Sequence, residues 1–147
     1  MTEDIQDEAA QAVRKPPQSI LSEQAILGGL MVDNSALDSV VDVIRPEDFY
    51  RRDHRLIYEE IAKLIQGAHP ADYLTVYESL KASGMDVEAG GLPYLMELAN
   101  NSPSAANIRR YAEIVHDKSV LRQLITVGDK IVTDALSPEG RETREIL

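Results

Sequence analysis

Hydrophobic residues recur three and four positions apart along most of the chain, which is the spacing of one face of an α-helix. This pattern predicts an all-α fold, in which a small head of several helices is followed by one long helix. Ser19 is expected to cap the first helix, which runs to about Val32. Gly28 and Gly29 inside that helix indicate that another helix packs closely against it.

Capping residues and apolar stripes mark the next two helices. Asp53 is expected to be the N-cap of a helix that runs through Gln66. Before it, Asn34 or Ser35 is expected to cap an amphipathic helix. The buried stripe of that amphipathic helix is expected to be Leu37, Val40, Val41 and Ile44.

Two short helices are expected to complete the head. Thr75 followed by Glu78 has the spacing of a capping box, which predicts a helix that Gly84 closes. Pro93 predicts the start of the second short helix. The inward residues of this helix are expected to be Leu95, Met96, Leu98 and Ala99.

From Ser104 to about Leu136 the chain has no proline and predicts one long helix. Thirty-odd residues would span roughly 48 Å, whereas a domain of about 110 residues has a radius of gyration of about 13 Å. The second half is therefore expected to project from the head and to need a partner helix. Its coiled-coil seam is Leu121, Leu124, Gly128, Ile131 and Ala135, and Val120, Ile125, Val127 and Val132 add apolar surface beside it.

The two ends of the chain complete the expected organisation. Residues 1–18 are acidic and end at Pro16-Pro17, which predicts a disordered acidic tail. After the long helix, "SPEGR" predicts a loop, and "ETREIL" predicts a second helix that breaks off at Leu147. The expected domains are therefore the tail over 1–18, the head over 19–118 and an incomplete helical hairpin, with a truncated second arm, over 119–147.

Composition narrows the function. The absence of cysteine excludes disulfides, thiolate catalysis and cysteine zinc sites, and it fits a reducing compartment. With neither a signal peptide nor a run of 18 apolar residues, we expect a cytoplasmic protein that does not span a membrane. The net charge of −10 disfavours strong binding of this chain to nucleic acid and favours an acidic surface that binds protein partners.

The stretch "DFYRRDHR", residues 48–55, concentrates the titratable side chains. One hypothesis is a metal-dependent hydrolase that uses Asp53, His54 and either Glu59 or Glu60. The spacing argues against it, because adjacent glutamates cannot face one point on a helix and no second histidine stands at a metal-binding distance in sequence. The candidates for a weak contact with DNA or with an acidic partner are Arg51, Arg52, Arg55, Arg109 and Arg110.

Four stretches together resemble the N-terminal domain of bacterial replicative DNA helicases of the DnaB family. They are "PPQSILSEQAILGGLMVDNSALDSV", "PEDFYRRDHRLIYEEI", "GGLPYLMELANNSPSAANIRRYAEIV" and "KSVLRQLI". Each is a weak motif alone, but their order and spacing match over about residues 16–147. The alternative is a helical adaptor protein that stands alone and has no motor.

The resemblance implies a helical head and hairpin that assemble with other helicase subunits into a trimer-of-dimers collar on a hexameric ring. That collar would dock primase and, in some bacteria, loader or initiator proteins. ATP, Mg²⁺ and most DNA contact would belong to a P-loop motor domain that unwinds DNA 5′ to 3′. No P-loop pattern occurs in this chain, so it is expected to have no ATPase or unwinding activity and no cofactor of its own.

The resemblance also implies where partners bind. Primase contacts in the family correspond to Tyr94, Ile125 and Ile131 of this sequence. The alternative for Tyr94 is packing within its short helix, and for the two isoleucines it is packing within the hairpin or the dimer. The full set expected to bind primase or a neighbouring subunit is Tyr94, Leu121, Leu124, Ile125, Ile131 and Ala135.

Overall fold

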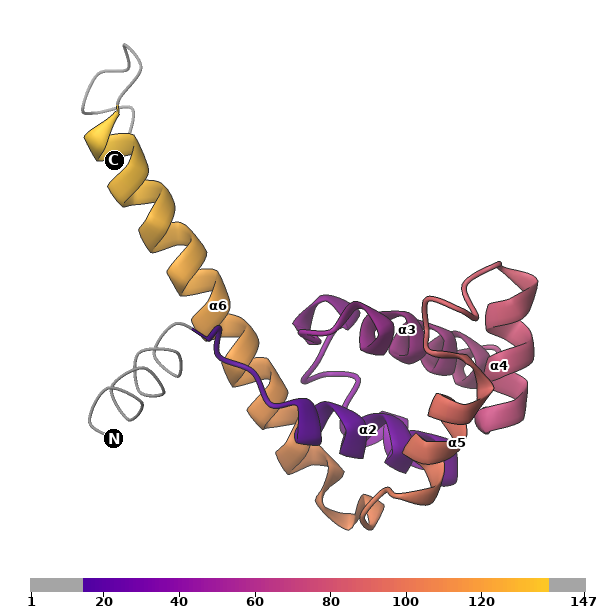
Figure 1. Ribbon diagram of the computed structural model, residues 1–147. Coiled ribbons are helices and arrows are strands. Elements are labelled where there is room, and N and C mark those ends of the chain that lie inside the picture. Colours follow the sequence, from indigo (N-terminus) through magenta and orange to yellow (C-terminus); the bar gives the residue numbers. More distant parts are fainter. Residues whose placement is uncertain (1–14, 138–147) are drawn as a thin grey trace, which may run out of the picture. The chain divides into compact units, whose positions relative to one another are not determined.

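The computed structural model describes residues 15–137, and every regular element in that range is a helix (Figure 1). The predicted all-α class with a long last helix is confirmed. No helix in this range is both long and apolar enough to cross a membrane. The α-helices are α2 (Ile20–Val32), α3 (Arg52–Gln66), α4 (Tyr73–Ala82), α5 (Gly91–Asn100) and α6 (Ile108–Leu136), and the 3₁₀ helices are η1 (Asn34–Ser39), η2 (Pro46–Asp48) and η3 (Ala105–Asn107).

The chain divides into two compact units between Ser119 and Val120. We call Gln18–Ser119 the head, and Val120–Leu136, which belongs to the other unit, the second half of α6. The predicted tail lies outside the described residues except for its last four positions. The predicted second arm of the hairpin, in residues 138–147, also lies outside them.

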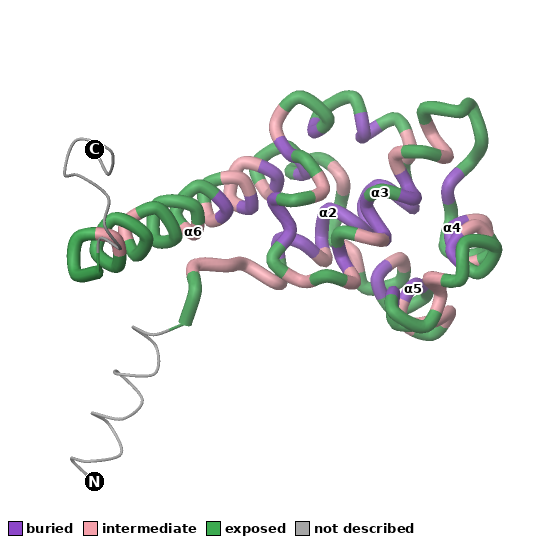
Figure 2. Tube along the Cα trace, turned by 90° about the horizontal axis from the view of Figure 1, so that it is seen from above, coloured by how far each residue is buried: buried purple, intermediate pink, exposed green. Residues whose placement is uncertain are grey.

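Helix α2 is the centre of the head. Nine of its thirteen residues are buried, and it packs against α3 and α5 (Figure 2). Its N-terminus is capped as the sequence predicted, because the Ser19 hydroxyl accepts a hydrogen bond from the Ser22 amide at 3.3 Å. Around α2 the core collects Phe49, Ile57, Ile61, Val76, Leu80 and Leu95, all of them buried.

The predicted close packing at the glycine pair of α2 is confirmed. A Cβ on Gly28 would overlap the carbonyl oxygen of Leu98 on α5 and lie 2.7 Å from the Ser102 side chain. A Cβ on Gly29 would lie 3.2 Å from the Ile108 side chain. Glycine therefore lets the α5 backbone approach α2 more closely than any side chain would allow.

The predicted helix after Asn34 is wrong in its cap and its type. Asp33 is the N-cap, because its carboxylate accepts from the Ser35 amide at 3.1 Å, and the element is the short 3₁₀ helix η1. Asn34 does not cap because its side chain bonds the backbone of Ala71, on the loop before α4, as both donor and acceptor. Three residues of the predicted stripe are buried, but Val41 is exposed.

Two details of the short helices also differ from the prediction. Thr75 does belong to a capping box, but its partner is Asp72, whose carboxylate accepts from the Thr75 amide at 2.8 Å. Glu78 is therefore not the second member of the box. On α5, Leu95 and Leu98 are buried whereas Met96 is exposed, because adjacent helix positions point about 100° apart.

Replacing Gly28 with alanine should lower the free energy of unfolding by about 1–3 kcal/mol, because the new methyl group must push α5 away from α2. Gly128→Ala is the matched control, since no described atom lies within 4 Å of the Cβ it would add. That change should stabilise the protein by about 1 kcal/mol through helix propensity. Urea denaturation followed by circular dichroism measures the stability of both variants. Equal effects would contradict the close packing of α5 against Gly28.

Tyr58 should make stability fall in alkali. It is buried with its ring 5.1 Å from that of Phe49, and desolvation, followed by the charge of Asp48, raises its pKa to about 12. Below about pH 10, near the usual pKa of tyrosine, Tyr58 is protonated in both the folded and the unfolded protein. Above that pH the hydroxyl ionises first in the unfolded protein, which stabilises the unfolded state. By about pH 11 wild type should lose about 1 kcal/mol relative to Tyr58→Phe, as measured by urea unfolding across the pH range.

Candidate functional site

A chain of hydrogen bonds links three helices of the head through buried polar side chains. Glu23 on α2 is 1% exposed and His54 on α3 is 0% exposed. The His54 Nδ1 atom lies 2.8 Å from Glu23 Oε1, and its Nε2 atom lies 2.6 Å from the hydroxyl oxygen of Tyr94 on α5. A carboxylate only accepts, so Nδ1 carries a proton that points to Glu23, and in the tautomer with that single ring proton Nε2 accepts the Tyr94 O–H.

Glu23 also anchors the backbone that leads into α3. Its carboxylate accepts from the backbone amides of Tyr50, at 2.8 Å, and Arg51, at 3.5 Å. The prediction that Asp53 is the N-cap is wrong, since α3 begins at Arg52 and Asp53 accepts from the Arg51 guanidinium at 3.0 Å. Sequence reasoning missed this role of Glu23 because the carboxylate stands 27 residues before the Tyr50 amide that it binds.

Tyr94 is half-buried and held on several sides. Its hydroxyl oxygen accepts from the Gln24 amide at 3.2 Å. Its ring lies nearly parallel to that of His54, with centroids 6.0 Å apart, and the Arg51 guanidinium carbon lies 5.4 Å from the ring centroid. Burial raises the pKa of Tyr94, so the hydroxyl keeps the proton that it donates to His54.

An acid, a histidine and a hydroxyl in this order resemble a nucleophilic triad, but the chemistry does not fit one. Nucleophilic catalysis needs a hydroxyl that is easily deprotonated and open to substrate, whereas burial raises the pKa of Tyr94 and His54 is fully enclosed. The arrangement is suited to holding α2, α3 and α5 together.

The residues proposed for a metal-dependent hydrolase do not assemble into a site. No three His, Asp or Glu side chains in residues 15–137 are grouped so that they could hold a metal ion. Glu59 is exposed, and Glu60 is buried with its carboxylate bonded to the Ser79 hydroxyl. His54 is already bonded to Glu23 and Tyr94.

The five arginines that the sequence suggested for DNA or for an acidic partner all have contacts within the chain. Arg52 pairs with Glu88 at 2.9 Å, and Arg55 donates to the carbonyl oxygens of Phe49 and Tyr50. The remaining pairs are Arg51 with Asp53, Arg109 with Asp42, and Arg110 with Glu113. Four of these arginines are therefore paired with an acid of the head, Arg55 is held by neutral carbonyl groups, and a contact with DNA stays a prediction.

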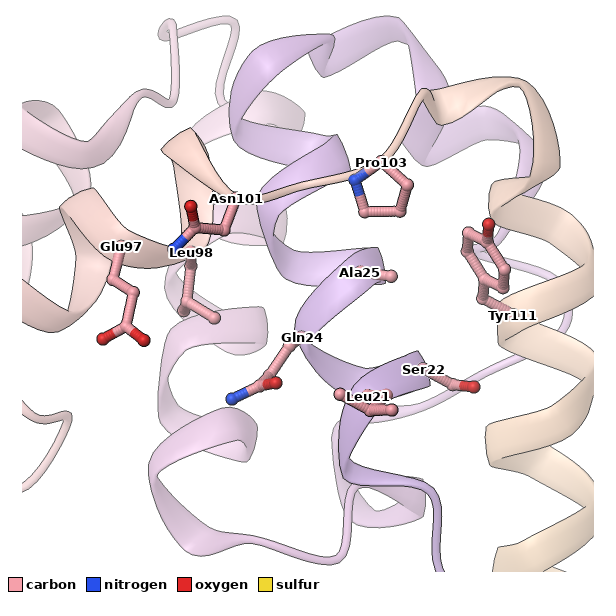
Figure 3. Close-up of a pocket in the computed structure, with 9 residues that line it drawn as sticks. All are labelled: Leu21, Ser22, Gln24, Ala25, Glu97, Leu98, Asn101, Pro103 and Tyr111. Carbon is pink, nitrogen blue, oxygen red and sulfur yellow. The ribbon is translucent and has the colours of Figure 1, made fainter.

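A pocket of about 330 Å³ lies between α2, α5 and the beginning of α6 (Figure 3). Gln24, which donates to Tyr94, is part of its wall, and Glu97 stands one turn after Tyr94 on α5. Local sequence patterns gave no signal for this pocket because its walls come from distant segments. The lining residues are Leu21, Ser22, Gln24, Ala25, Glu97, Leu98, Asn101, Pro103 and Tyr111.

Most residues in the second half of α6 are exposed (Figure 2), and its large apolar residues are among them. Leu124 is 62% exposed and Ile125 is 50% exposed. Leu121, Ile131 and Ala135 are exposed as well, so every partner residue predicted on this helix is open. The other large exposed apolar side chains of this segment are Val120, Val127, Val132 and Leu136.

These side chains form one continuous face. With successive positions about 100° apart, the ten apolar or glycine residues from Val120 to Leu136 fill one half of the helix, and the seven polar residues fill the other. In the first half of α6 the buried residues are Ile108, Ala112, Val115 and Ser119. That buried stripe and the apolar face lie about 180° apart around the helix axis, so the apolar face does not continue the stripe that packs into the head.

The comparison with protein families decides what kind of domain this is. Residues 15–117 match the family model of the DnaB-like helicase N terminal domain. The chain belongs to this family. The predicted family resemblance is thereby confirmed.

Curated relatives of this DnaB-like chain include replicative helicases from several bacteria. The replicative DNA helicase DnaB of Haemophilus influenzae is 41% identical over 141 residues, which cover 96% of this chain and 30% of the relative. The DnaB of Geobacillus stearothermophilus is 44% identical over 126 residues, which cover 86% of this chain and 28% of the relative. The chain thus spans about 30% of the length of the relatives it matches.

Solved structures agree with the DnaB-like fold. The crystal structure of the N-terminal domain of DnaB helicase from Mycobacterium tuberculosis matches with a TM-score of 0.86 at 38% identity, covering 90% of this chain and 92% of that one. A DnaB-like replicative helicase, described with its interactions with primase, matches with a TM-score of 0.67 at 21% identity, covering 82% of this chain and 29% of that one. The second match shows a shared fold.

Glu23→Gln should lower the free energy of unfolding of this DnaB-like domain by about 1–3 kcal/mol. The amide has one acceptor oxygen, so its NH₂ group would face a donor, either the Tyr50 amide or His54 Nδ1–H. Glu97→Gln is the matched control, because Glu97 is exposed on α5, and it should change stability by less than about 0.5 kcal/mol. If urea unfolding gave the same stability for both variants, the stabilising role of the Glu23 hydrogen bonds would be wrong.

Proposed function

We propose that this chain is a non-catalytic oligomerisation and primase-docking domain of a replicative DNA helicase. The observation that carries the proposal is the continuous, exposed apolar face on the second half of α6. Monomeric soluble proteins rarely expose an apolar surface of this kind, because it gains free energy when another protein covers it. Membership of the DnaB-like N-terminal family indicates which proteins those are.

Different parts of this face suit the two kinds of partner. The seam residues recur at spacings of three and four, as packing against a helix of another helicase subunit would require; they are Leu121, Leu124, Gly128, Ile131 and Ala135. Ile125 lies about 100° from Leu124 around the helix, beside that seam, and is therefore assigned to primase. The helicase described with its primase interactions has the same fold, which supports a primase-docking role for the domain as a whole.

The proposal places the chemical activity elsewhere in a longer protein. The curated relatives are replicative helicases of which this chain matches about 30%. In such a parent, assembled as a cytoplasmic hexamer, ATP, Mg²⁺ and most DNA contact would belong to a motor domain. This chain would supply the collar for subunit pairing and for primase, and loader or initiator proteins are further candidate partners.

Ile125→Asp should weaken binding of the primase C-terminal region at least about 10-fold, because a buried carboxylate without a partner costs more than 1.4 kcal/mol. Isothermal titration calorimetry of the 147-residue chain measures the affinity, and circular dichroism should show unchanged helix content. Thr126→Asp is the matched control, since it adds the same charge one position away on the polar half of α6. It should leave the affinity within about twofold.

Equal affinities for the wild type, Ile125→Asp and Thr126→Asp would exclude Ile125 from the primase surface. A wild-type chain that does not bind primase at all would contradict the docking function itself. In the same samples, sedimentation should show whether Leu124→Asp weakens self-association more than Thr126→Asp does, as the assignment of the seam to another subunit requires.

A further inference from the structure

The hydrogen-bond chain through His54 has a feature that core stability alone does not need. A buried carboxylate and a buried imidazole are costly to desolvate, so a helix junction is more often filled by apolar residues. Here Glu23 and His54 lead from the first turn of α2 to Tyr94, a half-buried residue at the surface of the head. The chain of polar groups therefore ends where a partner protein could touch it.

Several contacts hold Tyr94 in place while part of its side chain stays exposed. Its hydroxyl donates to His54 and accepts from Gln24, and Arg51 lies over its ring. Gly90 closes the remaining side, with a left-handed φ of 97° that favours glycine. A Cβ at Gly90 would lie 2.9 Å from the ring of Tyr94, so the backbone there is in direct contact with it.

We propose that Glu23 and His54 are positioning residues, which hold Tyr94 as a fixed aromatic anchor for the protein that docks on the head. This inference deepens the proposed function and rests on it. Rigid aromatic side chains are good anchors, because a partner that binds them does not have to immobilise a free rotamer. Glu23 takes part indirectly, since its contact with Nδ1 sets the tautomer that makes Nε2 an acceptor for Tyr94.

The surroundings of Tyr94 indicate the chemistry of the group that it receives. The hydroxyl proton is committed to His54, so the exposed part of the side chain offers apolar ring rather than a free donor. Glu97, one turn further along α5, is exposed and has no ion pair within residues 15–137. In a chain with a net charge of −10, this favours an apolar side chain beside a lysine or arginine on the partner.

Two variants separate positioning from folding. Tyr94→Phe keeps the ring and removes the hydroxyl. His54→Asn keeps an N–H near the position of Nδ1, which can still bond Glu23, but its side chain is too short to reach Tyr94. Each should weaken binding of the primase C-terminal region about 3- to 10-fold, measured by calorimetry at a temperature where circular dichroism shows every variant folded.

The double variant shows whether His54 and the Tyr94 hydroxyl affect primase binding together or independently. If His54 acts through the Tyr94 hydroxyl, Tyr94→Phe combined with His54→Asn should bind no more weakly than either single variant. A purely structural role would lower the urea midpoint of each variant and leave the affinity of the folded protein unchanged. NMR relaxation of labelled aromatic rings should also show faster ring motion at position 94 in Tyr94→Phe than in wild type, and equal motion would overturn the proposal.

Failure of this inference differs from failure of the proposed function. If wild type binds primase and Ile125→Asp does not, but Tyr94→Phe binds like wild type, then only the positioning role is overturned. If wild type does not bind, the docking function fails and the anchor role fails with it. Should His54→Asn not fold, Tyr94→Phe decides the question through its affinity and its ring motion.

Discussion

The head depends on how the buried carboxylate of Glu23 is satisfied. A charge removed from water must receive several hydrogen bonds, or the fold loses more free energy than the surrounding apolar contacts supply. The Tyr50 amide and the imidazole of His54 meet that need, and both belong to the segment that begins α3. The same bonds therefore fix where α3 starts, how it meets α2 and, through His54, where Tyr94 on α5 is held.

The sequence predicted elements well where the decisive contact is local. The Ser19 cap, the glycine pair of α2 and the unbroken last helix follow from spacing and residue type within a few positions. The sequence-based predictions failed where a residue distant in sequence makes the contact that was expected from a nearby residue. Asp53 has the character of an N-cap, but it binds Arg51, while Glu23 on another helix holds the backbone that leads into α3. The predicted N-cap at Asn34 is wrong for the same reason, because the Asn34 side chain is hydrogen-bonded to the backbone of Ala71.

The candidate binding surfaces also differ in how far the sequence could predict them. The apolar face of α6 could be read from the sequence, since it depends only on which residues stand about 100° apart on one helix. The pocket beside Gln24 could not, because its walls come from α2, α5 and the beginning of α6. The polar network around Tyr94 was also hidden, since Glu23 and His54 are 31 positions apart and only folding brings them together.

The polar and apolar parts of the chain point to one kind of binding. In the head, arginines pair with acids or carbonyl groups of the same chain, so little positive charge is left for a phosphate backbone. On α6 the apolar face lies about 180° around the helix from the stripe that ends at Ser119, so it is not a continuation of that stripe. In the proposed docking function, burial of apolar area rather than charge would supply the free energy of association, which suits proteins as partners better than nucleic acid.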